Sequence, residues 1–265
     1  MKKSIALLLL ISVFALALIG CQQKEEYSDL SEAIENTNSK ERYSANFLAE
    51  FTFDNDLVTL LFAQGFYSVD RDKNLLYSEF VQTHLGHSGR YTEICKDGYV
   101  YADLDGEKNR YKKNTAEHLE YIYYSTALNF KYEDIDHLKT AENSDGTLYS
   151  FTVNGDYDDK LMTMLGEGIY STAQIKKPQK EKTRFGEIKC EYNLTEDENG
   201  IKTLLSRQIV FKVYLYDTPP YSPTYTPPEE DYMLELKVRF KLSYKDFGEA
   251  VSIPEPDTEQ YKPVE

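Results

Sequence analysis

The feature that most constrains the fold is a strict alternation of apolar and polar residues in long segments. It is cleanest from Tyr232 to Tyr244. One phase of this segment is apolar or aromatic throughout: Tyr232, Leu234, Leu236, Val238, Phe240, Leu242 and Tyr244. The other phase is polar from Glu235 to Ser243. Because successive side chains of a strand point to opposite faces, the pattern predicts a long strand with one covered and one solvated face.

The same period of two starts at Tyr43 and runs to Phe53, and shorter apolar segments follow it. Asp-Gly pairs separate several of them, and such pairs supply the backbone angles of tight hairpins. The further expected strands are Leu57–Val69, Leu75–Leu85, Arg90–Cys95, Tyr99–Leu104, Asn109–Lys113, Leu138–Glu142, Thr147–Val153, Phe185–Leu194 and Ile201–Tyr216. The first half therefore reads as a meander.

Helical spacing of apolar residues is confined to three stretches. These are Ser28–Asn38, Thr115–Phe130 and a short stretch after Asn154 that contains Leu161 and Leu165. About ten strands with so few helices predict an α+β, mostly β fold. We expect one strongly curved antiparallel sheet, a half-barrel, with helices covering its concave face. A single domain is expected over residues 29–254, followed by a loose acidic tail at residues 255–265.

The chain opens with a pattern typical of a secretory signal. Lys2 and Lys3 precede an apolar run from Ile5 to Ile19. The next residues complete Leu18-Ile19-Gly20-Cys21, which resembles the lipobox of bacterial lipoproteins. The resemblance implies that residues 1–20 are removed, that Cys21 is lipidated, and that residues 21–28 form a lipidated tether. The acyl chains would then hold the protein on the extracytoplasmic side of the cell membrane.

The sequence disfavours two alternatives to lipid anchoring. An uncleaved membrane-spanning helix is disfavoured because the run from Ile5 to Ile19 is short and lacks a following basic cluster. Binding to nucleic acid, or lying flat on anionic lipid, is disfavoured by the net charge of -15. The sequence therefore predicts attachment to the membrane through the lipid alone.

The order of elements carries a second resemblance. A lipobox, a leading helix, a meander, a helix, a hairpin, another helix and long final strands precede the segment Tyr244–Pro254, YKDFGEAVSIP. Together they resemble the LolA/LppX/LprG group of half-barrel lipoproteins and carriers. The resemblance implies a sheet wrapped around an apolar cavity with helices as its lid, which holds or moves lipids. A departure is the proline-rich loop at residues 218–228, which is either a docking strip for an envelope protein or a stiff insertion.

Candidate catalytic and metal motifs fail on spacing. Gly86-His87-Ser88-Gly89 lacks one spacer of the hydrolase elbow and joins two expected strands. The series Asp70, Asp72 and Asn74 begins like a calcium loop but has Leu75 where glycine is required and Val81 where glutamate is required. His84 and His87 have no neighbouring ligand cluster. We therefore predict no enzyme, no metal and no cofactor.

Cys95 and Cys190 remain once Cys21 is lipidated. Outside the cytoplasm they could form one disulfide, or both could be half-buried free thiols. The sequence leaves both alternatives open.

The sequence predicts a non-catalytic protein that binds a lipid or acyl chain in an apolar cavity. Its expected wall and lid residues are Phe47, Phe51, Phe53, Leu119, Ile122, Leu234, Leu236, Val238, Phe240 and Leu242. The 23 tyrosines suit the mouth of such a cavity, but tyrosine is also a good strand former. The alternative is a structural or partner-binding surface lipoprotein of the same fold with a filled core.

Overall fold

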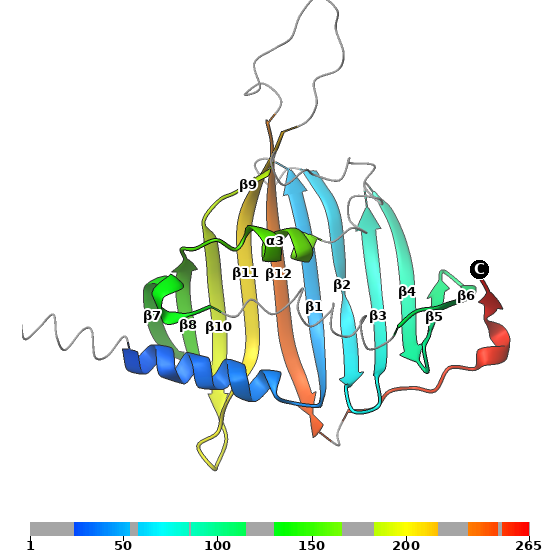
Figure 1. The fold of residues 1–265 in the computed structure, drawn as a ribbon, viewed down its shortest axis with the longest axis horizontal. Coiled ribbons are helices and arrows are strands. Elements are labelled where there is room, and N and C mark those ends of the chain that lie inside the picture. Colours follow the sequence, from blue (N-terminus) through cyan, green and yellow to red (C-terminus); the bar gives the residue numbers. More distant parts are fainter. Residues whose placement is uncertain are drawn as a thin grey trace, which may run out of the picture.

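The computed structural model describes residues 24–53, 58–84, 86–114, 130–165, 183–216, 233–248 and 251–264. These residues form one open, curved sheet of 13 strands, with helices on one face (Figure 1). The order along the sheet is β13-β6-β5-β4-β3-β2-β1-β12-β11-β10-β8-β7. The predicted fold class, a half-barrel of mostly β structure, is confirmed.

Two meanders make up the sheet. The first comprises β1 (Arg42–Phe53), β2 (Val58–Asp70), β3 (Leu75–His84), β4 (His87–Lys96), β5 (Tyr99–Leu104) and β6 (Glu107–Lys112). The second comprises β7 (Ile135–Asn143), β8 (Gly146–Val153), β10 (Ile188–Glu196), β11 (Lys202–Tyr216) and β12 (Met233–Phe247). Antiparallel pairing of β1 with β12 joins the two meanders into one sheet.

One expected strand proves to be two. The segment Phe185–Leu194 is divided into β9 (Thr183–Phe185) and β10, and both pair with β11. The division lies at Gly186, whose backbone N–H donates a hydrogen bond to the Lys212 carbonyl at 2.9 Å. Residues 186–188 lie opposite only residues 211–212 of β11, so the division is a bulge in the pairing with β11.

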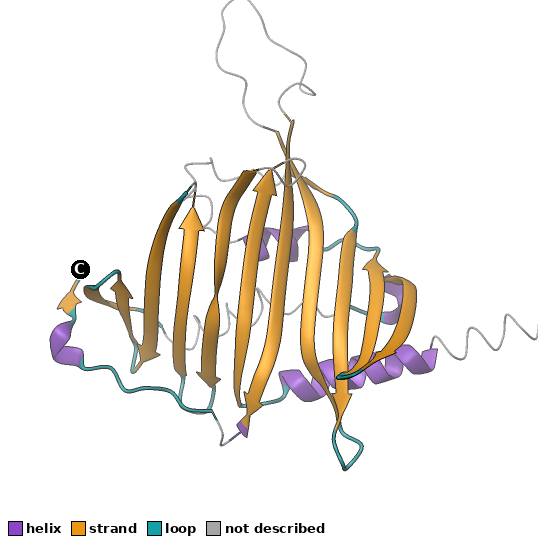
Figure 2. Ribbon diagram, turned by 180° about the vertical axis from the view of Figure 1, so that it is seen from behind, coloured by secondary structure: helices purple, strands orange, loops and turns teal. Residues whose placement is uncertain are grey.

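Helices cover one face of the sheet, which we call the concave face. The helix at residues 24–38 crosses the β7 to β12 half, and α3 (Asp158–Leu165) lies over the same face (Figure 1). Seen from behind, the strands stand in front of both helices (Figure 2). The first helix begins at residue 24, so residues 24–28 of the expected tether are helical. Of the expected helix Thr115–Phe130, residues 115–129 lie outside the described residues.

The carboxyl-terminal segment is ordered along the edge of the sheet. After a 3-10 turn at Thr258–Gln260, β13 (Lys262–Pro263) runs parallel to β6. The Val264 N–H donates to the Arg110 carbonyl at 2.8 Å. The Tyr261 ring packs edge-on against Tyr101 on the convex face, with ring centroids 5.4 Å apart. The expectation of a loose tail is therefore wrong for residues 258–264, because backbone and ring contacts hold them.

Candidate ligand-binding face

The concave face carries the predicted wall residues in facing pairs. Across β1 and β12, Phe47 lies opposite Leu242, and Phe53 lies opposite Leu236. Phe51 lies opposite Val238 in the same register. Residues directly opposite in an antiparallel pair share one face of the sheet. The structure therefore brings these six predicted residues together.

Part of this face belongs to a buried cluster that also contains residues of both helices. Phe51, Leu236 and Val238 are at most 1% exposed and share this cluster with Leu30 and Ala33 of the first helix and with Leu161 and Leu165 of α3. We call it the helix-covered cluster. Phe53 and Phe240 are partly buried at its margin, and the Phe240 ring packs edge-on against Phe51. At these positions the predicted cavity wall is part of the buried core.

A second cluster lies towards β5. Its buried members are Tyr43, Ala45, Tyr67, Val69, Leu76, Cys95, Val100 and Leu242. Phe47 packs on this second cluster and also meets Phe80, with ring centroids 5.7 Å apart. Gly65 lies between these two rings in the register, and a Cβ there would come within 2.1 Å of the Glu79 carbonyl oxygen. The absence of a side chain at Gly65 thus permits the close approach of β3.

Four predicted site residues have no described side chain. Leu119, Ile122 and the lipidation residue Cys21 lie outside the described residues. Leu234 pairs with Leu215 of β11, and this register is all that is described of it. The predicted lid and anchor therefore stay predictions.

A buried arginine lies where the two clusters meet. Arg207 of β11 is 4% exposed and faces Tyr192 of the helix-covered cluster on one side and Leu242 of the second cluster on the other. Its guanidinium carbon is 5.8 Å from the centroid of the Tyr244 ring. Among the described residues, no hydrogen-bond partner reaches its Nε or Nη1 atom.

Two buried tyrosine hydroxyls lie beside this arginine. Tyr67 and Tyr192 are at most 5% exposed. The Tyr192 hydroxyl makes no hydrogen bond within the described part of the chain, and the Tyr67 hydroxyl interacts only weakly with that of Tyr43. Burial raises the pKa of both well above the usual tyrosine value, and Arg207 offsets this only in part. Both hydroxyls therefore stay protonated at neutral pH and cannot neutralise the guanidinium.

Arg207 is the functional candidate that the sequence reasoning missed. In β11 it falls in phase with Ile209, Phe211 and Val213, all of which are buried on the concave face. The sequence did contain a signal for Arg207, because it is a charged residue among the apolar positions of an alternating strand. What surrounds it could not be read, because Tyr67 and Tyr192 come from strands distant in sequence.

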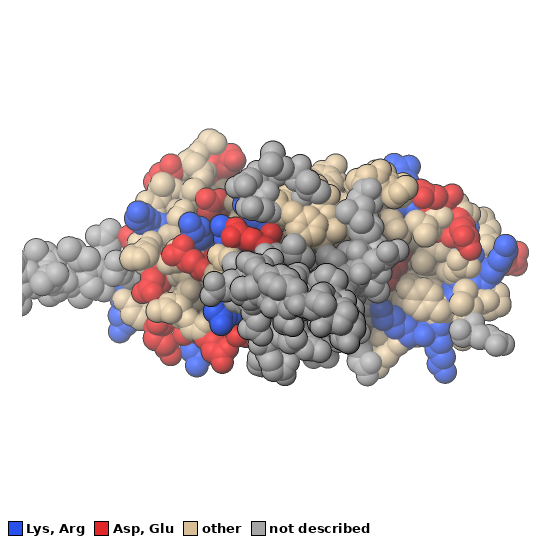
Figure 3. Space-filling view, turned by 90° about the horizontal axis from the view of Figure 1, so that it is seen from above, with Lys and Arg blue, Asp and Glu red and all other residues tan. Residues whose placement is uncertain are grey.

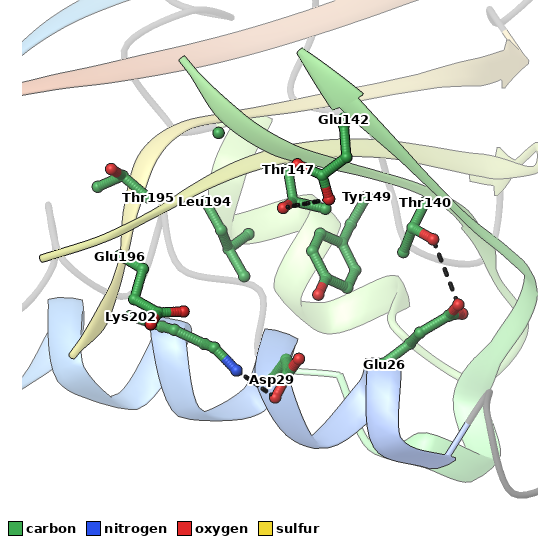
Figure 4. A pocket seen from close by; sticks show the side chains of 11 residues that line it. Glu26, Asp29, Thr140, Glu142, Thr147, Tyr149, Leu194, Thr195, Glu196 and Lys202 are labelled. Carbon is green, nitrogen blue, oxygen red and sulfur yellow. Dashed lines mark hydrogen bonds and ion pairs between the residues drawn. The ribbon is translucent and has the colours of Figure 1, made fainter. Parts of the chain in front are cut away.

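A polar pocket of about 540 Å³ opens between the first helix and the β7 to β11 half of the sheet (Figure 4). We call it the edge pocket. Four carboxylates and one lysine line it: Glu26, Asp29, Glu142, Glu196 and Lys202. Lys202 forms an ion pair with Asp29 at 2.6 Å. Burial and these acids raise the pKa of Tyr149 to about 12. The pocket is acidic and unsuited to an acyl chain or an anion.

A shallower pocket of about 480 Å³ lies on the convex face around Gly65. Its side chains include Asn46, Gln64 and Val81, which point away from the helices. Glu79 and Arg90 form an ion pair across it at 3.6 Å. Phe47, one of the predicted wall residues, also lines it, together with Phe80.

Cys95 and Cys190 are free, buried thiols. They lie on β4 and β10, which five strands separate. At about 4.8 Å per inter-strand step, the two strands are about 29 Å apart along the sheet. A disulfide needs Cα atoms within about 7 Å of each other. Of the two alternatives, the structure therefore has free thiols and no bridge between these residues.

The hydrolase-like and calcium-loop-like motifs of the sequence lie at turns between strands. Gly86 lies in the connection between β3 and β4, and His84 pairs with His87 across it. Asp70 precedes the β2–β3 turn, where its carboxylate lies 3.1 Å from Arg42 Nε and accepts a hydrogen bond from the Lys73 N–H. Asp70 thus serves the turn and an ion pair.

None of the helices that the structure describes combines the length and the apolar character needed to cross a bilayer. No family model matches the sequence, and no curated protein matches it either.

Comparison with solved structures finds several half-barrel proteins. LprF from Mycobacterium bovis is 11% identical over 88% of this chain and 97% of its own, with a TM-score of 0.49. A LolA superfamily protein from Nitrosomonas europaea is 11% identical over 89% of this chain and 97% of its own, with a TM-score of 0.26. Lipovitellin is 8% identical over 81% of this chain and 26% of its own, with a TM-score of 0.32. The LolA group expected from the sequence is among these structures. At such identities and TM-scores the similarity says nothing about the ligand of this chain.

Proposed function

We propose that this protein is a lipid-anchored lipoprotein of the bacterial envelope, and that its concave face binds the acyl part of a lipid without catalysing a reaction. The observation that most supports this proposal is the kind of structure that covers the concave face. Apolar side chains extend over both halves of the concave face, and the described cover is two helices, not a second sheet. The first helix is held by Leu30 and Ala33 and by hydrogen bonds of Asn36 and Thr37 to the backbone of β11. Separating it from the sheet would break these contacts but none of the pairing between strands.

The binding proposal is tested with neighbouring residues on opposite faces. Ala49 is partly buried beside the helix-covered cluster, whereas Leu48 pairs with Lys241 on the convex face. Ala49→Trp should fill space that an acyl chain would use, and Leu48→Trp should not. Native mass spectrometry of protein purified without detergent should show co-purified lipid in the wild type and in Leu48→Trp, and clearly less in Ala49→Trp. Absence of lipid from all three would count against the proposal.

The anchor is tested separately. Cys21→Ala should shift the protein from the membrane fraction to the soluble fraction, and should abolish incorporation of labelled fatty acid. Cys95→Ala is the matched control, because Cys95 is buried inside the sheet and should leave both readouts unchanged. Unchanged membrane attachment of Cys21→Ala would contradict lipidation at this residue.

One observation favours the alternative, a partner-binding lipoprotein with a filled core. Phe51, Leu236 and Val238 are almost fully buried in a cluster that includes side chains of both helices, as expected for a filled core. On the described surface seen from above, acidic and basic side chains are interspersed (Figure 3), which suits a soluble exported domain. Deletion of residues 218–228 with loss of a captured envelope protein, together with absence of lipid, would favour this alternative.

A further inference from the structure

A buried arginine normally has an anionic partner, because removing a guanidinium from water is costly. Arg207 is the only basic residue that is buried among the described residues. The ionisable groups that interact with it most strongly are four tyrosines: Tyr244, Tyr192, Tyr67 and Tyr43. Burial raises the pKa of Tyr67 and Tyr192 well above the usual value, so neither carries a negative charge at neutral pH. The rings offer a cation–π contact, which compensates only part of the cost.

The carboxylates of neighbouring strands point away from Arg207. Glu191 of β10 pairs with Gln208 and accepts a hydrogen bond from its side chain at 2.8 Å. Glu50 of β1 pairs with Arg239, and the two form an ion pair at 3.7 Å. Both pairs are one residue out of phase with Arg207 and therefore lie on the convex face. The sheet thus separates its described nearby carboxylates from its buried cation.

We infer that Arg207 and the hydroxyls of Tyr67 and Tyr192 form an oxyanion subsite on the concave face, which binds the carboxylate or phosphate of an acyl ligand. The unpartnered Nε and Nη1 atoms belong to the planar fork that matches such oxyanions, and the two hydroxyls add further donors. The inference rests on the proposed function, since it assigns the polar end of the same ligand.

The position of the subsite indicates an amphiphilic ligand. The helix-covered cluster lies on one side of Arg207 and the second cluster on the other, so a chain attached to the oxyanion meets apolar surface in both directions. The acidic edge pocket would repel the same oxyanion. A free phosphate could satisfy the same donors but would leave the apolar surface unused. The two sources of oxyanion are therefore to be distinguished by experiment.

The test uses the full mature chain after removal of co-purified lipid. The probes are oleate, oleoyl lysophosphatidate, neutral mono-oleoylglycerol and inorganic phosphate, and the readout is affinity by calorimetry. We expect the two anionic lipids to bind about tenfold more tightly than the neutral one, the effect of about one charge-assisted hydrogen bond. Arg207→Met should remove this preference and leave binding of mono-oleoylglycerol unchanged.

The matched control is Arg239→Met, which deletes the same charge on the convex face and should keep the preference. If Arg207→Met does not fold, Tyr67→Phe and Tyr192→Phe give the answer, because each deletes one hydroxyl and should weaken only the anionic lipids. A preference for anionic lipids that survives in Arg207→Met would overturn the subsite. If Arg207→Met does not fold, a preference that survives in both tyrosine variants would overturn it.

The remaining outcomes separate this inference from the proposed function. Equal binding of neutral and anionic lipids by the wild type would overturn the oxyanion subsite and leave lipid binding standing. Binding of none of the lipids would overturn the proposed function. If inorganic phosphate alone binds as tightly as the anionic lipids, and Arg207→Met abolishes it, the subsite is supported with a soluble oxyanion as its ligand.

Discussion

Two buried charges in this protein are treated in opposite ways. Asp70, 2% exposed at the β2–β3 turn, lies 3.1 Å from Arg42 Nε and accepts a hydrogen bond from the Lys73 N–H. Arg207, 4% exposed in the middle of β11, has aromatic rings and protonated hydroxyls around it. Among the described residues, the fold supplies a counter-charge for the first and none for the second. Asp70 therefore contributes to folding through its ion pair, and the proposed oxyanion subsite would give Arg207 its partner.

Position within the sheet explains the contrast. Asp70 lies at the end of a strand, where Arg42 faces it in the register and the turn offers backbone N–H groups. Arg42 is held in turn by donating a hydrogen bond to the Val251 carbonyl at 2.9 Å. Arg207 has apolar neighbours in its own phase and cannot reach water. A strand end can therefore satisfy a buried charge locally, and a strand centre cannot.

The largest effect is expected from breaking the satisfied pair. Arg42→Met leaves Asp70 buried without its arginine, and should lower the free energy of unfolding by about 3 kcal/mol, as for other broken buried pairs. Urea denaturation of the lipid-free protein measures it. A loss below about 1 kcal/mol would mean that Asp70 is stabilised mainly by the turn.

A smaller effect should distinguish tyrosines with and without a partner. The Tyr157 hydroxyl donates to Asp134 Oδ2 at 2.7 Å, so Tyr157→Phe should lower the free energy of unfolding by about 1.5 kcal/mol. Tyr192→Phe deletes a buried hydroxyl without a partner and should leave stability unchanged or slightly higher. Equal losses in the two variants, measured by denaturation side by side, would show that Tyr192 has a partner within the chain.

Removing the unsatisfied charge should not destabilise the lipid-free protein. Arg207→Met replaces a buried guanidinium by an apolar chain of similar length, and should leave the free energy of unfolding unchanged or raise it by about 1 kcal/mol. The thermal midpoint with and without oleate measures both states, and the stabilisation by oleate should shrink in the variant. A loss of several kcal/mol without lipid would contradict the view that Arg207 lacks an internal partner.

The smallest effect on stability is expected for Lys73, which lies at the exposed side of the Arg42–Asp70 ion pair. Lys73 is 67% exposed and lies 4.0 Å from Asp70, so Lys73→Met should change stability by only about 0.3 kcal/mol. Its backbone N–H, which remains in the variant, is the group that Asp70 uses. A loss comparable to that of Arg42→Met would shift the main counter-charge of Asp70 to Lys73.

Most strands could be predicted because their pattern is local. The segment Tyr232–Tyr244 became β12, Met233–Phe247, with Leu236 and Val238 buried as its phase required. The division between β9 and β10 could not be predicted, since it depends on how Gly186 meets β11. The ordered tail at residues 258–264 depends likewise on an edge strand distant in sequence.

The candidate site was predictable only in part. Alternation placed Phe47, Phe51 and Val238 on one face, because a strand's period assigns each side chain to a side. It could not say which of them the first helix covers. The surroundings of Arg207 were also out of reach, because they depend on strand order: β10 and β12 flank β11, and Tyr67 reaches Arg207 from β2.

By itself, the sequence determined most of the strands, their buried phase and the curved-sheet class, since each depends on residues that are close together in the chain. Only the tertiary structure decided that β1 lies beside β12, that the two cysteines are far apart, and that a lone arginine is enclosed by tyrosines. The physical reason is that burial and pairing of a charge depend on groups that meet only after the sheet has closed around them.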